Sequence, residues 1–164
     1  MPTEIERKFL VSDTGILQNS HCIHILQGYL FSDDHSVFRL RLSDNSATLT
    51  IKGKISDLER LEYEYLIPVE HAKELLSGFC HHGFVEKIRH HVEFDGNLWE
   101  IDEFMGDNSG LIVAEIELKT TAEKFSVPPW AGAEVSHDGR YTNSQLARHP
   151  FSQWGIRPEN DHKK

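Results

Sequence analysis

The chain has 164 residues, with 26 Asp and Glu against 17 Lys and Arg, and its formal net charge at pH 7 is −9. This length predicts one domain with a core of its own and leaves no room for a separate catalytic domain. The acidic balance argues against a nucleic-acid-binding protein, because such proteins usually present a broad basic surface. A phosphorylated ligand is still compatible with it, provided that it binds in a locally basic pocket.

Two features of the chain bear on its cellular location. The two cysteines, Cys22 and Cys80, show no metal-ligand spacing, and the N-terminus begins with a charged segment instead of a basic and apolar leader. We therefore expect a reduced, cytoplasmic protein with no membrane segment.

Eight strand-like segments follow one another along the chain, separated by turn sequences such as Asp95-Gly96-Asn97. They span residues 3–11, 22–31, 36–43, 46–53, 59–67, 84–95, 97–105 and 110–119. Eight antiparallel strands can close a barrel whose interior is just wide enough for side chains or for one small ligand. The expected fold is therefore mainly β, a closed eight-stranded antiparallel barrel with covering helices.

The remaining segments predict the covering helices. Pro68 precedes an amphipathic stretch that ends before Gly83, which predicts a helix over part of the apolar outside of the barrel. A short helical start is expected at residues 121–125 and a second helix at 144–148. Trp130 and Trp154 are expected to pack on the barrel wall, and Tyr141 to close one tunnel mouth. We expect a single domain over residues 1–157, followed by a loose polar tail at 158–164.

Charged residues recur at alternate positions in most of these strands. Because successive side chains of a strand point to opposite faces, each such pair shares one face, and the other face is largely apolar. A solvent-exposed face would explain the alternation in any single strand. It does not explain why the signs are sorted by strand. The pairs are Glu4 and Glu6 with Lys8, Arg39 and Arg41, Glu62 and Glu64, Lys87 and Arg89, Glu100 and Asp102, and Glu115 and Glu117, with Lys52 standing alone.

If these faces point into the barrel, they line a charged tunnel. Cations on some walls would hold a polyanion, and carboxylates on others would hold the metal ions that neutralise it. Arginine suits the bidentate recognition of phosphate oxygens.

The ordered set of motifs resembles the CYTH-domain family, also called triphosphate tunnel metalloenzymes. The similarity runs from Glu4 to about Ala147, and its most specific element is the N-terminal E-x-E-x-K signature. Residues 128–130 and 140–143 also resemble those of short bacterial members that hydrolyse inorganic tripolyphosphate. The supporting segments are residues 27–30, 39–41, 49–53, 62–64, 87–89, 102 and 115–117.

The resemblance implies a role for each charged group, with Mg²⁺ or Mn²⁺ beside a bound triphosphate. The phosphate oxygens would be held by Lys8, Arg39, Arg41, Lys52, Lys87 and Arg89. The metal would be held by Glu4, Glu6, Glu115 and Glu117. Glu62, Glu64 and Asp102 would lie near the metal or the attacking water as catalytic groups.

Three other functions remain open on the sequence alone. A class IV adenylyl cyclase or a thiamine triphosphatase would use the same tunnel, and a phosphate-binding module without catalysis would need fewer acids than are present. The partner is expected to be inorganic triphosphate or another small molecule with a triphosphate group, and neither a nucleic acid nor a membrane. An outward apolar face on the barrel leaves room for a homodimer.

Overall fold

A computed structural model describes residues 2–155, and within this range nine β-strands form one antiparallel sheet. The eight predicted strands are all confirmed, with ends that differ by no more than a few residues. They are β1 (Thr3–Val11), β2 (His21–Ser32), β3 (Ser36–Ser43), β4 (Ser46–Lys54), β5 (Glu59–Ile67), β6 (Phe84–Phe94), β7 (Asn97–Phe104) and β8 (Ile112–Leu118). The short β9 (Ala131–Glu134) was not predicted.

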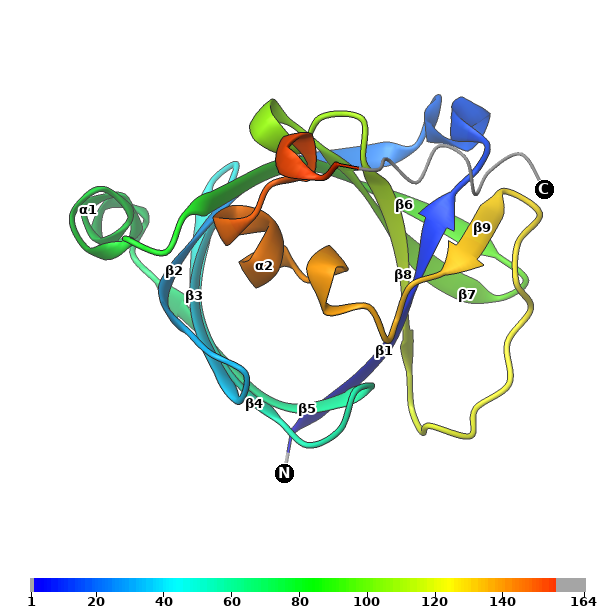
Figure 1. The fold of residues 1–164 in the computed structure, drawn as a ribbon, viewed down its shortest axis with the longest axis horizontal. Coiled ribbons are helices and arrows are strands. Elements are labelled where there is room, and N and C mark those ends of the chain that lie inside the picture. Colours follow the sequence, from blue (N-terminus) through cyan, green and yellow to red (C-terminus); the bar gives the residue numbers. More distant parts are fainter. Residues whose placement is uncertain (1, 156–164) are drawn as a thin grey trace.

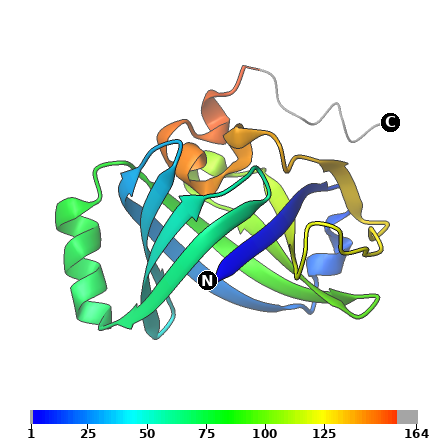
Figure 2. The same cartoon turned by 90° about the horizontal axis from the view of Figure 1, so that it is seen from below.

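The eight long strands close into a barrel in the order β5-β4-β3-β2-β6-β7-β8-β1. The closing seam is short, because β1 pairs with β5 only through Thr3 to Ile5. The later part of the same edge of β1 pairs with β9 instead. Figure 1 looks along the barrel and Figure 2 shows it from the side.

Local sequence explains the tight hairpin between β6 and β7. Asp95 and Gly96 both adopt a positive φ, 47° and 78°, as a two-residue turn that matches the twist of the strands requires. Aspartate and glycine are among the residues that tolerate this backbone best.

The largest apolar cluster lies on the outer face of β1, β7 and β8. Trp99 is fully buried there and packs edge-on against Trp130 and Phe125, with ring centroids 5.4 and 5.9 Å away. The long segment between β8 and β9 thus covers this side of the barrel, and Trp130 packs on the wall as predicted.

Helix α1 (Val69–Phe79) covers the outer face of β2, β3 and β4, as predicted. Leu76 and Cys80 pack on Leu40. Close approach is possible because Gly28 has no side chain: a Cβ atom there would lie 2.8 Å from Leu76 Cδ2.

The C-terminal segments close one end of the barrel. These are α2 (Asn143–Arg148) and the 3₁₀ turns Gly139–Tyr141 and Phe151–Gln153, and α2 lies across the ring of strands in Figure 1. Tyr141 and Leu146 pack there against side chains that point inward from the strand ends: Leu10, Val85, Phe104 and Val113. Tyr141 thus belongs to the closure of one end, as predicted, and Trp154 stacks edge-on against Tyr141 at this end and not on the wall.

The helical start predicted at 121–125 is wrong. Within the described residues, only a turn at residues 121–122 interrupts an irregular segment, and the chain then extends so that Phe125 reaches the ring of Trp99. Aromatic packing outweighs the weak local helix preference at this site.

The helix expected at 144–148 is confirmed by α2. The predicted tail, residues 158–164, lies outside the described residues. No helix in residues 2–155 is long and apolar enough to cross a membrane.

Candidate active site

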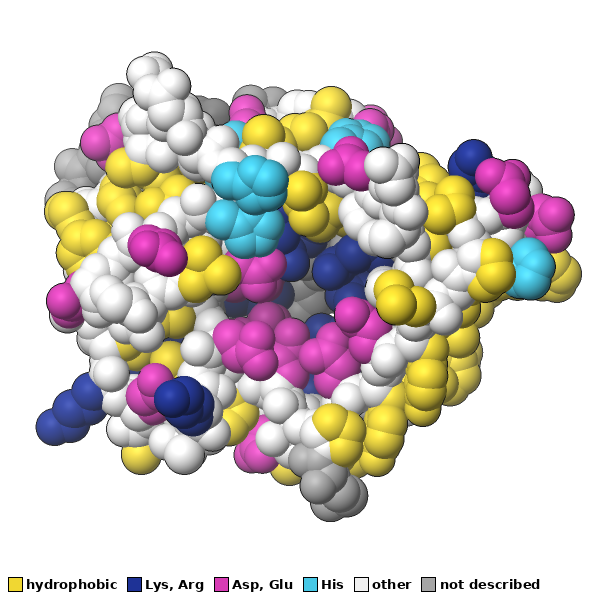
Figure 3. All heavy atoms as spheres, turned by 180° about the vertical axis from the view of Figure 1, so that it is seen from behind, with side chains coloured by type: hydrophobic (Ala, Val, Ile, Leu, Met, Phe, Trp, Pro, Cys, Tyr) yellow, Lys and Arg dark blue, Asp and Glu magenta, His cyan; other side chains and the backbone are white. Residues whose placement is uncertain are grey.

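The charged faces of the strands point into the barrel and line one cavity of about 280 Å³. All of the predicted site residues except Asp102 line it. Figure 3 shows its open side, where Lys and Arg side chains lie deep in the hollow behind a rim rich in Asp and Glu.

The order of the strands separates the two signs of charge. The predicted cations of β4, β3 and β6 lie on neighbouring strands, joined by β2, whose inward Gln27 and Tyr29 are uncharged. The acid pairs of β7, β8, β1 and β5 occupy the other half of the ring. A basic half therefore faces an acidic half across the cavity, and the cations in the acidic half are Lys8 on β1 and Arg60 on β5.

Asp102 lies behind the cavity wall and is fully buried between two cations. Its Oδ2 accepts a hydrogen bond from Lys87 Nζ at 2.6 Å, and Arg89 donates to both of its oxygens at 2.7 and 2.8 Å. Burial alone would raise the pKa of Asp102, but Arg89 and Lys87 outweigh burial and lower it. Asp102 therefore stays ionised and fixes both cations.

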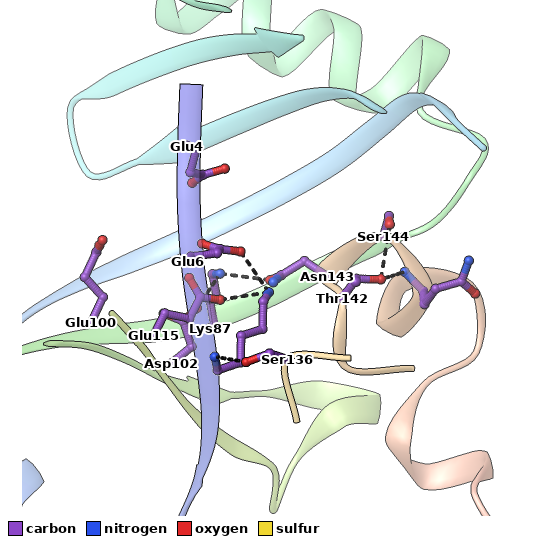
Figure 4. A network of polar contacts seen from close by, with 12 residues as sticks. Glu4, Glu6, Lys87, Glu100, Asp102, Glu115, Ser136, Thr142, Asn143 and Ser144 are labelled. Carbon is purple, nitrogen blue, oxygen red and sulfur yellow. Dashed lines mark hydrogen bonds and ion pairs between the residues drawn. The ribbon is translucent and has the colours of Figure 1, made fainter. Parts of the chain in front are cut away.

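Lys87 is fully buried as well and has a second partner, because its Nζ also donates to Asn143 Oδ1 at 2.8 Å. Figure 4 shows Asn143 reaching from α2 toward Lys87. Burial lowers the pKa of Lys87 to about 7, and the charge on Arg89 adds to this although Asp102 opposes it. Lys87 thus titrates near neutrality, where an arriving anion would favour its charged form.

Lys8 lies among the carboxylates of the acidic half, with its Nζ 3.2 Å from Glu115 Oε1 and 3.3 Å from Glu6 Oε1. Burial opposes its charge, but Glu115 and Glu6 outweigh burial and raise its pKa. Burial would likewise raise the pKa of Glu115, yet Lys8 and Arg89 hold that pKa well below its ordinary value. Glu115 thus interacts with Lys8 in the acidic half and with Arg89 in the basic half, and so connects the two halves of the cavity electrostatically.

The cations of β4 and β3 also reach the acidic half. Lys52 Nζ donates to Glu4 Oε2 at 2.6 Å and lies 3.8 Å from Glu62. Arg39 lies 3.7 Å from Glu64, and its buried Nε has no hydrogen-bond partner within residues 2–155. Thr50 lies between Arg39 and Glu64 and bonds to both.

Arg41 differs from these cations because it has no carboxylate partner within the described residues. Its Nε and one terminal nitrogen donate to Gln27 Oε1, and Gln27 in turn donates to Tyr29. Burial and the like charges of Arg39 and Arg89 lower the pKa of Arg41 to about 10. An anion beside it would remove this repulsion.

Part of the acidic half lacks neutralising cations. Glu117 forms no hydrogen bond or ion pair with residues 2–155, and burial together with the charges of Glu4 and Glu62 raises its pKa. Burial and Glu115 also raise the pKa of Glu6, although Lys8 is close to Glu6 and opposes the increase. Carboxylates that repel one another are suitable ligands for a hard divalent cation.

No three acidic, histidine or cysteine groups within residues 2–155 converge closely enough to form a complete metal cage. A hard divalent cation held by one or two of the cavity carboxylates would complete its coordination with waters and phosphate oxygens. The residues present therefore fit a metal that binds together with a phosphorylated ligand.

Sequence reasoning missed several residues of the cavity. Their signals were weak: Tyr29 is a single aromatic residue, Arg60 is not part of a like-charged pair, and the residues at the start of α2 come from a segment far along the chain. The missed lining residues that carry polar groups are Tyr29, Arg60, Thr142, Asn143 and Ser144.

The barrel and its divided cavity define a class of protein with a charged cavity inside a closed β-barrel. In comparison with known proteins, residues 2–148 match the CYTH domain, and the chain belongs to this family.

Two relatives cover almost the whole chain. An inorganic triphosphatase of Acetivibrio thermocellus is 42% identical over 154 residues, which are 94% of this chain and 99% of the relative. An inorganic triphosphatase of Nitrosomonas europaea is 40% identical over 149 residues, which are 88% of this chain and 97% of the relative. Among solved structures, the inorganic triphosphatase NE1496 superposes with a TM-score of 0.66 at 37% identity and covers 90% of this chain and 96% of its own.

Replacing Asp102 by Asn should destabilise the barrel by about 3–5 kcal/mol at pH 6.5, because two buried cations lose their shared carboxylate. The loss should be smaller at pH 9.5. The folded pKa of Lys87, about 7, lies below its ordinary value of 10.5, so the folded state binds fewer protons between these values. Stability contributed by Lys87 therefore rises with pH across this window, as its buried charge is removed.

Urea unfolding of both proteins at the two pH values measures this effect. Asp107→Asn, at an exposed carboxylate outside the barrel, is the matched control and should change stability by less than about 0.5 kcal/mol. Equal effects of the two substitutions would contradict the role assigned to the Asp102 carboxylate.

Proposed function

We propose that this protein hydrolyses inorganic tripolyphosphate within the barrel in a reaction that requires Mg²⁺ or Mn²⁺. The observation that carries the proposal is the division of one cavity into a basic half and an acidic half. A polyanion alone would suit only the basic half, and a metal alone only the acidic half. The names of the relatives from Acetivibrio thermocellus and Nitrosomonas europaea support the same activity.

The proposed phosphate ligands come from β1, β3, β4 and β6. They surround the cavity from several directions, which suits an elongated anion better than a single phosphate. Tripolyphosphate would replace carboxylates as the partner of some of these cations and would supply a partner for Arg41. The residues are Lys8, Arg39, Arg41, Lys52, Lys87 and Arg89.

The proposed metal ligands are Glu4, Glu6, Glu115 and Glu117. These carboxylates would hold a divalent cation, and the chemistry that the cation would supply is the activation of a water as the nucleophile. The raised pKa values of Glu6 and Glu117 support this assignment, because a metal ion would relieve the repulsion that raises them.

Glu62 and Glu64 are proposed as the groups that orient the attacking water. Both line the cavity, and Glu64 is nearly half exposed and can meet solvent. Asp102 is proposed as a positioning residue that acts through Lys87 and Arg89, since both of its oxygens are engaged by these two cations.

The cavity wall disfavours substrates with an organic group. Within the described residues, only Tyr29 and Val37 contribute carbon-rich neutral side chains to it. An adenine or thiamine ring would find little surface on which to stack. Inorganic triphosphate is thus favoured over ATP, the substrate of a cyclase, and over thiamine triphosphate.

We propose the cytoplasm as the location, which the two free thiols Cys22 and Cys80 support.

Purified protein should release phosphate from tripolyphosphate when Mg²⁺ or Mn²⁺ is present and should lose this activity in excess chelator. Pyrophosphate should react far more slowly, because binding energy from the non-reacting phosphates helps to position the reacting one. ATP and thiamine triphosphate should also be poor substrates. Colorimetric phosphate assays measure all four reactions, and chromatography of the ATP reaction detects cyclic AMP. Rapid formation of cyclic AMP, or equal kcat/KM for pyrophosphate and tripolyphosphate, would overturn the proposal.

Glu117→Gln should lower turnover by orders of magnitude and raise the metal concentration that gives half-maximal rate, because it removes a metal-binding charge at nearly constant size. Its stability should stay near that of the wild type, since Glu117 has no ion-pair partner within residues 2–155 to lose. Glu74→Gln on the exposed face of α1 is the control and should leave the metal titration unchanged. A wild-type metal titration in Glu117→Gln would refute its role as a ligand.

We further propose a homodimer formed through an apolar row on the outside of the barrel. Phe31, Phe38, Ile51 and Tyr63 are direct neighbours across β2 to β5, and all four are more than one third exposed. Sedimentation velocity should show a dimer for the wild type and a folded monomer for Ile51→Lys. A wild-type monomer at every concentration would refute this interface.

A further inference from the structure

Arg60 is the one cavity-lining cation that has no polar partner in the described part of the chain. Each of the six predicted phosphate ligands donates to or pairs with a nearby side chain, and Arg41 has at least Gln27. The side chain of Arg60 makes no hydrogen bond and no ion pair within residues 2–155, although it lines a cavity rich in carboxylates. The guanidinium of Arg60 can therefore bind a ligand without first breaking a hydrogen bond or an ion pair.

The position of Arg60 on the barrel is unusual for a cation. It lies on β5, in the acidic half, where its neighbour across the seam on β1 is Glu4 and its neighbour on β4 is Lys54. The positive charge of Arg60 lowers the pKa of Lys8, although Glu115 and Glu6 have a larger effect and raise it. Arg60 and Lys8 are therefore close enough to repel one another, and a bound anion between them would remove that repulsion.

Arg60 also stands where the main cavity meets a second one. The second cavity, of about 200 Å³, lies between the β2–β3 turn, the β4–β5 loop and the segment that leads into α2. The two cavities share wall residues, among them Lys52, Arg60 and Ser144. The two cavities are thus adjacent at Arg60.

A purely structural role explains these observations less well. The stem of an arginine can cover apolar surface while its charged head stays in water. However, the cavity wall near Arg60 offers only Val37 as an aliphatic side chain within the described residues. A guanidinium carries five N–H donors, and phosphate oxygens match its planar fork in geometry.

We propose that Arg60 binds a non-reacting end phosphate of tripolyphosphate at the junction of the two cavities and thereby selects a chain of three phosphates over a chain of two. The inference rests on the proposed triphosphatase function. On this proposal, tripolyphosphate contacts Arg60 with one end phosphate while its other phosphates lie against the basic half, and pyrophosphate, one phosphate shorter, binds without Arg60.

The test compares Arg60→Gln and Arg60→Lys with the wild type. Arg60→Gln should raise KM for tripolyphosphate at least about tenfold, the effect of losing one charge-assisted hydrogen bond. The inhibition constant of pyrophosphate, used as a competitive inhibitor, should change less than about twofold. Arg60→Lys should recover part of the loss, because it keeps the charge and loses the fork. As a readout without turnover, tripolyphosphate with Mg²⁺ should raise the Tm of Arg60→Gln only at higher concentrations than it needs with the wild type.

Lys54→Gln is the matched control. Lys54 faces Arg60 across β4 and β5, lines only the second cavity and is paired with Asp57. Removal of its charge changes the local potential to a similar extent but removes no proposed phosphate contact, so KM should change less than about twofold.

The outcomes separate this inference from the function on which it rests. Equal increases in KM for Arg60→Gln and Lys54→Gln would reduce the effect to general electrostatic attraction and overturn the inference, as would an unchanged KM in Arg60→Gln. An equal loss of pyrophosphate and tripolyphosphate binding would overturn the selection of chain length. A wild-type protein that neither releases phosphate nor gains stability from tripolyphosphate would instead overturn the proposed function itself.

Discussion

A barrel that keeps its charged faces inside cannot use its interior as a hydrophobic core. The apolar residues of this protein therefore pack on the outside of the strands, and each outer cluster requires its own cover. Helix α1 provides it over β2 to β4, and the segment before β9 provides it over β1, β7 and β8. Within residues 2–155, only the closed end of the barrel has an apolar interior, where α2 is inserted. The chain segments outside the barrel thus make the polar tunnel possible.

Inside the barrel, opposite charges must balance before any ligand arrives. Asp102 fixes Lys87 and Arg89, and Glu115 connects Arg89 with Lys8. Buried pairs of this kind add little net stability, since desolvation offsets much of their attraction. Their value here is geometric, because they hold cations of different strands in place before a polyanion binds and so lower the entropy cost of binding.

Alternation with a period of two, together with the turn sequences, was enough to predict all eight barrel strands and to show which charged residues share a face. That these faces point into the barrel was conditional on the sequence alone and was implied by the family resemblance. Alternation could not distinguish Asp102 from Glu100, because both share one face and only the packing of Arg89 and Lys87 buries the former. Arg60 was missed because a single cation gives no pattern. The segment at 121–125 was misjudged because Phe125 is placed by contacts with residues far away in the sequence, which local propensity does not report.

The seam between β1 and β5 has the fewest residue pairs among the eight barrel strands, since three pairs hold it while the other neighbouring barrel strands share five or more. Side chains on its two sides belong to the same cavity, with Glu4 and Lys8 on one edge and Arg60 and Glu62 on the other. A ligand that contacts both edges would join them, and its binding free energy would stabilise the closed ring. Ligand binding and ring closure would then be thermodynamically linked, so that binding of the proposed ligand would tighten the barrel.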